Sequence, residues 1–108
     1  MKKSTICPRF EKAISLLHQR WTALVIYQLL TGSQRFNTIQ SSIGISGKVL
    51  SERLKDLEHQ GIIARKVIPE TPVLIEYSLT EKGISLGPIL KEIENWSQLW
   101  VKLESEET

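Results

Sequence analysis

The side chains best suited to binding another molecule lie on one predicted helix, residues 46–60. Taking Leu50 as the inward reference, with about 100° per residue, Leu54 and Leu57 fall within about 40° of it and form a buried stripe. The opposite half of the helix is polar and holds Lys48, Ser51, Glu52, Lys55 and His59. The major groove of B-DNA admits one such helix, whose N-terminal residues reach base edges. Ordinary solvated helices have similar faces, so this pattern alone favours DNA contact only weakly.

The hydrogen-bonding groups of these side chains suggest different contacts. Lys48 can donate to guanine acceptors or to a phosphate, and Ser51 can donate or accept. Arg53, on the flank, and Lys55 favour phosphates, whereas Glu52 can accept from cytosine or hold a neighbouring lysine. The complete predicted DNA-binding set is Asn37, Ser46, Gly47, Lys48, Ser51, Glu52, Arg53, Lys55, Arg65 and Lys66.

Helix-capping signals place this helix second in a pair. Asn37 with Gln40 three residues later resembles a capping box that opens a short helix. Gly44 breaks that helix, and Ser46 is a good N-cap for the next one. Gly61 ends the second helix. A helix, a turn of a few residues and another helix predict a helix-turn-helix.

After the helix pair the residue period changes from helix to strand. Residues 62–68 are rich in β-branched side chains and predict a strand, residues 69–72 form a turn signal, and residues 73–79 are interpreted as the returning strand. A hairpin in this place corresponds to the wing of a winged helix, and Arg65 and Lys66 on its outgoing strand are candidates for phosphate contact. The expected fold is therefore mainly α with a small β-hairpin (α+β), a winged helix-turn-helix in a single domain, 1–108.

Further helices are predicted at both ends of the chain. Pro8 suits the first position of a helix, and a second run extends from Trp21 to Leu30, with Trp21 expected in the core. Thr80 caps a long final helix, which Gly87 and Pro88 should kink. Residues 104–108 are expected to form a frayed acidic tail.

The last helix carries a row of apolar residues. Trp96 and Trp100 are four residues apart, so they share a face. They either pack on the chain's own first helices or anchor a dimer interface, where aromatic residues dominate. The interface is the favoured reading. Its predicted residues are Leu86, Ile89, Ile93, Trp96, Trp100 and Leu103.

The net charge of +2 conceals an uneven distribution. Residues 1–66 hold eleven Lys and Arg against four acidic residues, and so carry +7. Residues 67–108 hold three Lys against eight Glu, and so carry −5. This asymmetry indicates a basic working face. An unevenly charged surface without a partner is the alternative.

Several function classes are disfavoured by the sequence. His18 and His59 are far apart without ligand-spaced partners, so no metal site and no cofactor are expected. There is no Gly-rich phosphate loop and no credible pair of nucleophile and base, which makes an enzyme improbable. No apolar run approaches the roughly 18 residues of a membrane helix, and no secretory signal is recognisable. The single cysteine, Cys7, fits a reducing cytoplasmic compartment.

Several motifs recur in the order and spacing of one known family. They are Cys7-Pro8, Arg20-Trp21-Thr22, Arg35-Phe36-Asn37, the segment 44–55, Leu57-Glu58, Gly61-Ile62-Ile63 and the segment 77–83. Over residues 6–100 the chain resembles the HxlR-type regulators, winged helix-turn-helix proteins of bacteria and archaea related to the MarR group. The resemblance implies a cytoplasmic, nucleoid-associated transcription regulator. It would bind double-stranded DNA at a pseudo-palindromic operator as a homodimer joined through its N- and C-terminal helices. A winged-helix protein–protein module without DNA binding is the alternative, against which the basic first segment argues.

The resemblance also makes Cys7 a candidate sensor, because several HxlR-type proteins use a cysteine at this position to sense oxidants or electrophiles. Cys7 precedes a predicted helix, and Lys2, Lys3 and Arg9 are close in sequence, which favours a thiolate. A thiol that only packs is the alternative. The chain departs from the family pattern where Val73 and the residue after it replace a basic wing position, which weakens the expectation of minor-groove contact.

Overall fold

The computed structural model describes residues 5–106 and confirms a mainly helical fold with a small antiparallel sheet. Its elements are α1 Pro8–His18, α2 Thr22–Leu29, β1 Gln34–Arg35, α3 Phe36–Ile43, α4 Gly47–His59, β2 Ile63–Ile68, β3 Leu74–Leu79, α5 Glu81–Ile84, α6 Gly87–Trp100 and a 3-10 turn Glu104–Glu106. The sheet has the strand order β1-β3-β2. The β2–β3 hairpin is the predicted wing.

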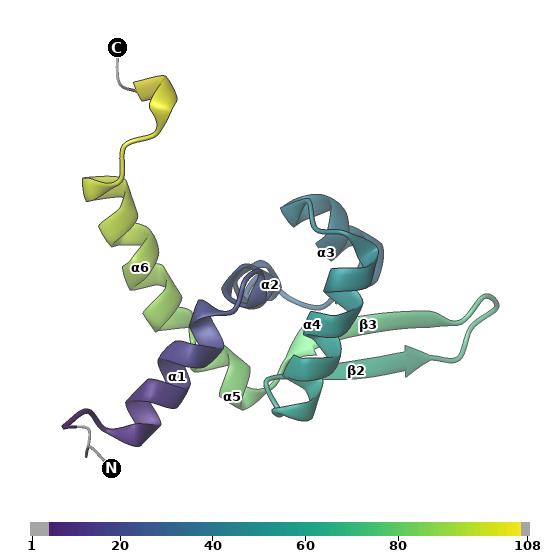
Figure 1. Ribbon diagram of the computed structural model, residues 1–108. Helices are drawn as coiled ribbons and strands as arrows, with labels where there is room; N and C mark the ends of the chain where they lie inside the picture. The colour runs from purple at the N-terminus through teal and green to yellow at the C-terminus, as the bar shows by residue number, and fades with distance from the viewer. Residues whose placement is uncertain (1–4, 107–108) are drawn as a thin grey trace.

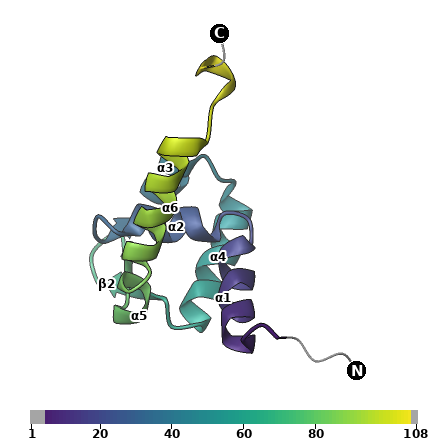
Figure 2. The same cartoon turned by 90° about the vertical axis from the view of Figure 1, so that its left-hand side faces the viewer.

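The elements form two groups around α2. In Figure 1, α4 and the β2–β3 hairpin lie on one side of α2, with the hairpin tip projecting outward. Helices α1 and α6 lie on the other side. Figure 2, turned by 90°, looks onto this side and shows α6 running across the front of α2. The helix-turn-helix and its wing are therefore exposed on one side of the molecule. The outer helices α1 and α6 are exposed on the other.

The core is built mainly from α2, α4 and the start of β2. Leu50, Leu54 and Leu57 are buried, which confirms the inward stripe predicted for α4. The other buried apolar residues are Val25, Ile26, Leu29, Ile39, Ile45, Ile62, Ile63 and Leu90. In contrast, α1 has no buried residue. The packing that fixes α4 therefore does not depend on burying α1.

Local capping signals around α4 are confirmed. The Ser46 hydroxyl accepts a hydrogen bond from the Val49 N–H at 3.3 Å, as an N-cap does. Gly44 ends α3 with φ of 72°, a left-handed conformation that costs glycine little. These caps set the angle at which α4 leaves the turn.

The capping box predicted at Asn37 is wrong. Helix α3 begins one residue earlier, at Phe36, with Arg35 as its N-cap and no side-chain capping bond. The reason is that Gln34 and Arg35 pair with Tyr77 and Glu76 as strand β1. This pairing holds the backbone extended up to the first residue of the helix.

The predicted long C-terminal helix is two helices. The Thr80 hydroxyl accepts from the Gly83 N–H at 3.2 Å and caps only α5, because the chain breaks before α6 begins at Gly87. Helix α6 ends at Trp100, so Leu103 lies outside the helix on which it was predicted. The tail predicted to fray starts with the 3-10 turn, and residues 107–108 lie outside the described residues.

Candidate nucleic-acid interface

The exposed face of α4 gathers most of the predicted DNA-binding residues. Ser46, Lys48, Glu52 and Lys55 are exposed, whereas Gly47 and Ser51 are half-buried. They lie opposite the buried stripe, so the core fixes which side chains point outward. Asn37 is exposed on α3, the first helix of the pair.

Arg53 is engaged within the protein, unlike the other predicted phosphate contacts. Its Nε donates to the Arg20 carbonyl oxygen at 3.0 Å, and its Nη1 lies 3.6 Å from Asp56 Oδ2. Its side chain is only 19% exposed. Arg53 thus fastens α4 to the turn between α1 and α2, where the Arg20 guanidinium carbon lies 5.0 Å from the centre of the Trp21 ring. Trp21 is half-buried against the core, as predicted.

The wing places its two basic residues on opposite faces of the sheet. Arg65 pairs with Tyr77 and Lys66 pairs with Glu76 in the β2–β3 register. Because side chains alternate along a strand, Arg65 shares its face with the buried Ile63, whereas Lys66 points to the other face. Both are exposed. From the sequence, Arg65 and Lys66 were equally good candidates for phosphate contact, because the sequence does not show which face of the sheet lies toward α4.

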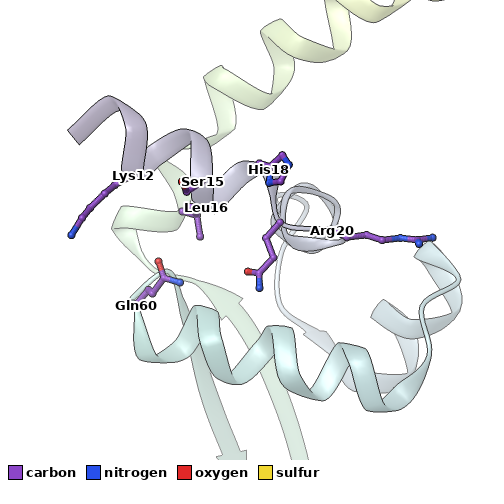
Figure 3. A pocket seen from close by; sticks show the side chains of 7 residues that line it. Lys12, Ser15, Leu16, His18, Arg20 and Gln60 are labelled. Atoms are coloured by element: carbon purple, nitrogen blue, oxygen red, sulfur yellow. The ribbon is translucent and has the colours of Figure 1, made fainter. Parts of the chain in front are cut away.

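An open hollow of about 860 Å³ separates α1 from the C-terminal end of α4. Figure 3 shows Leu16 of α1 and Gln60 on facing walls, whereas the Lys12 and Arg20 side chains extend away from the hollow. The cations near it therefore do not converge on a common point. The hollow exists because α1, which has no buried residue, packs loosely against the rest of the chain.

Helix α6 presents an uncovered apolar face. Trp96 is 60% exposed and Trp100 is 72% exposed, so they do not pack on the chain's first helices. Ile89 and Ile93 continue the row at helical spacing and are about half exposed. Leu103, beyond the helix, is also exposed. Leu86 differs from the other predicted interface residues because it is half-buried against the chain's own core.

One polar contact that the sequence did not reveal ties α6 to the body. The Tyr27 hydroxyl donates a hydrogen bond to the Glu94 carboxylate, joining α2 to α6. The hydrogen bond to this carboxylate, together with burial, raises the pKa of Tyr27 above its ordinary value of 10.0. Leu90 is buried one turn earlier on α6. Burial of Leu90 and the Tyr27–Glu94 hydrogen bond hold α6 against the body.

Cys7 lies at the N-cap of α1 with an exposed side chain. Its carbonyl oxygen accepts from the Glu11 N–H at 3.1 Å, which begins the helix. Lys2 and Lys3, which are close to Cys7 in sequence, are outside the described residues. Within residues 5–106, no group of three or more His, Cys, Asp and Glu side chains could hold a metal ion. In the same range, no helix has the length and apolar character needed to span a membrane.

Comparison with known proteins places these features in one family. The model of the HxlR-like helix-turn-helix family matches residues 16–105. The HTH-type transcriptional regulator YvaP of Bacillus subtilis is 58% identical over 102 residues, covering 94% of each chain. YodB, an HTH-type transcriptional regulator of the same organism, is 47% identical over 95 residues, covering 87% of this chain and 85% of its own.

Solved structures agree with this placement. The reduced form of YodB superposes with a TM-score of 0.80 at 44% identity, covering 91% of this chain and 97% of its own. The oxidised form of the redox regulator HypR superposes with a TM-score of 0.82 at 31% identity, covering 90% of this chain and 100% of its own. The fold is therefore shared with these regulators.

Proposed function

The chain belongs to the HxlR-like helix-turn-helix family of transcription regulators, and we propose that it binds double-stranded DNA sequence-specifically as a homodimer. In this proposal α4 enters the major groove and the β2–β3 wing lies on the flanking backbone. The protein acts in the cytoplasm, on the nucleoid. Cofactors and catalysis have no part in the proposed activity.

The observation that carries the proposal is the free outward face of α4. Lys48 and Lys55 are exposed, and within residues 5–106 neither forms an ion pair. Ser51 adjoins them with a hydroxyl that can donate or accept. A helix whose buried stripe is locked in the core, with free cations and donors outside, suits insertion into a groove.

The outer helices support the dimer part of the proposal. Helix α6, which carries the uncovered apolar row, lies on the opposite side of α2 from the wing (Figure 1). A two-fold axis through α6 and α1 would bury this row against its copy and leave both α4 helices free. The two helices would then meet successive major grooves about 34 Å apart on a pseudo-palindromic operator.

A double substitution on α4 tests the DNA-binding proposal. Lys48→Ala with Ser51→Ala should reduce the preference for the selected sequence over random duplex by about tenfold to a hundredfold, because base contacts are lost. The sequence is first obtained by selection from a random pool, and affinities are measured by fluorescence anisotropy. Lys91→Ala, which removes one charge from an exposed position on α6, should leave this preference unchanged.

Two results would contradict the proposal in different ways. A double variant that keeps the parent's sequence preference would rule out α4 as the reading helix. A parent that binds no duplex even at low salt would instead favour the protein–protein module.

We further propose that Cys7 senses electrophiles or oxidants. Among the structural relatives are a quinone-bound and a diamide-treated form of YodB and an oxidised form of HypR. In this chain the thiol is exposed at the start of α1, whose apolar residues Phe10 and Ile14 are about half uncovered. A group added there would change packing at the proposed dimer base and so alter the spacing of the two α4 helices.

A thiol-directed reagent checks this role. N-Ethylmaleimide adds across its double bond to the Cys7 thiolate, forming one carbon–sulfur bond without an oxidant. We expect it to change the affinity of the parent for its selected duplex severalfold and to leave Cys7→Ser unaffected. Equal responses of the two proteins, or no response from the parent, would assign Cys7 a packing role only.

A further inference from the structure

A second, smaller hollow lies between α4 and the wing. It has a volume of about 400 Å³ and is lined by Ser51, Leu54, Lys55 and Glu58 of α4 and by Arg65 and Tyr77 of the wing. Ser51 is three and four residues before the adjacent Leu54 and Lys55, and Glu58 is four and three residues after them, so the four residues form one flank of α4. Leu54 is buried and belongs to the core, so the α4 side of the hollow is held in place by core packing.

The sheet register explains why the wing contributes these two residues. Arg65 and Tyr77 are directly opposite each other on β2 and β3, and directly opposed residues point to the same face. This is the face toward α4, since Ile63 two residues before Arg65 is buried. Lys66 and Glu76 point away from α4 and do not line the hollow.

The side chains of the hollow present more donors than acceptors. Lys55 and Arg65 are cations, and Glu58 is the single carboxylate among the lining residues. Within residues 5–106 these three groups form no ion pair with one another, and the hydroxyls of Ser51 and Tyr77 have no hydrogen-bond partner. An oxyanion with several acceptor oxygens and at least one negative charge matches this set.

We propose that this hollow seats one phosphate of the DNA backbone beside the groove that α4 enters. Arg65 and Lys55 neutralise the phosphate, and the Tyr77 hydroxyl donates to one of its oxygens. Glu58 opposes the anion and limits its affinity. The inference rests on the proposed DNA binding and adds to it a specific contact made jointly by helix and wing, which fixes the depth of α4 in the groove.

The test compares Arg65→Ala with Lys66→Ala, two substitutions at adjacent residues of β2. The probe is a random-sequence duplex of about 30 base pairs, which spans two half-sites, and its affinity is followed by fluorescence anisotropy over a range of salt concentrations. Arg65→Ala should lower the slope of log affinity against log salt by about 0.9 for each lost phosphate contact. Lys66→Ala removes the same charge on the other face and should lower the slope clearly less.

Two further variants test the other groups of the hollow, one by removing a hydroxyl and one by removing a negative charge. Tyr77→Phe keeps the ring that packs on the core and removes only the hydroxyl, so affinity should fall about threefold with the slope unchanged. Glu58→Gln removes the opposing charge and should raise affinity by a similar factor. Circular dichroism of each variant checks that the fold is retained.

The outcomes separate this inference from the proposed function. Absence of duplex binding by the parent overturns both. Duplex binding by the parent with equal slope losses in Arg65→Ala and Lys66→Ala, or with no loss in Arg65→Ala, overturns the hollow alone. Calorimetric titration with inorganic phosphate tests whether the hollow binds a free phosphate ion instead of a phosphate of the DNA backbone. Phosphate binding that Arg65→Ala abolishes without a change in the DNA slope would assign the hollow to free phosphate and overturn the backbone contact.

Discussion

Gly83→Ala is expected to destabilise the protein by about 3 kcal/mol or more, which is a large part of the roughly 5–15 kcal/mol that stabilises a typical domain. A Cβ at position 83 would lie 2.3 Å from the Ile62 carbonyl oxygen and 3.0 Å from Leu79 Cδ2. The Gly83 backbone is not in the left-handed region, so the cost is steric. Moving α5 to relieve the contact would disturb the Ile62 oxygen, which accepts from the Thr80 N–H at 3.0 Å and from the Thr80 hydroxyl at 3.0 Å.

Thermal unfolding followed by circular dichroism measures this loss. At equal protein concentration, the melting temperature of Gly83→Ala should fall by about 10 °C or more. Gly47→Ala is the matched control, because a Cβ at position 47 would make an ordinary contact, 3.5 Å from Gln40 Nε2. In the first turn of α4 this change should leave stability unchanged or raise it by about 0.5–1 kcal/mol. A Gly83→Ala protein that melts like the parent would mean that α5 is not fixed at this junction.

Features around α4 were predictable because their causes are local in the sequence. The Ser46 hydroxyl caps an N–H three residues away, and Gly44 and Gly61 adopt left-handed conformations that suit helix ends. The stripe of Leu50 and its neighbours follows from helical period alone. The division of α4 into a buried stripe and an outward polar face was therefore predicted correctly from residue type and spacing.

Features that depend on distant partners were missed or misread. Asn37 resembled an N-cap, but pairing of Arg35 with Glu76 moved the helix start. Arg53 was interpreted as a phosphate contact, but its Nε donates to the Arg20 carbonyl oxygen, 33 residues away. No local pattern carries information about such pairs.

The same reason explains the incomplete prediction of the site and of the last helix. Tyr77 and Glu58 line the hollow only because the wing packs beside α4, which no sequence period specifies. Gly87 was interpreted as a kink, but it is buried, and a Cβ there would lie 3.2 Å from Leu30 Cδ2. Close approach of α6 to the residue that ends α2 therefore accounts for this glycine.

Trp96→Ala with Trp100→Ala is expected to convert the proposed dimer largely to monomer. Truncating a large aromatic at the centre of an interface costs about 2–4 kcal/mol, which corresponds to about thirtyfold to a thousandfold in dissociation constant. In a two-fold dimer each substitution removes a ring from both copies. The two rings are 60% and 72% exposed in the single chain, so their loss should affect association far more than the fold of each protomer.

Sedimentation velocity over a range of concentrations measures the shift, and circular dichroism checks that helix content is kept. Lys91→Ala with Gln98→Ala is the matched control. These two residues are seven apart and lie on the other side of α6 from the tryptophans, and both are exposed. The control should sediment like the parent. A parent that stays monomeric at high concentration would remove the dimer from the proposal altogether.

Dimer loss should also change how the protein binds its operator. A monomer presents one α4, so it contacts one half-site and forgoes the gain in affinity that comes from linking two binding events. The double tryptophan variant should therefore bind a selected palindromic duplex and a single half-site with nearly equal affinity, whereas the parent should favour the palindrome by about a hundredfold or more. Helix α6, which carries the tryptophans, lies on the opposite side of α2 from the wing (Figure 1). A loss of this ratio with unchanged half-site affinity would therefore show that the tryptophans act on assembly and not on DNA contact. An unchanged ratio would place the contact between protomers elsewhere than on α6.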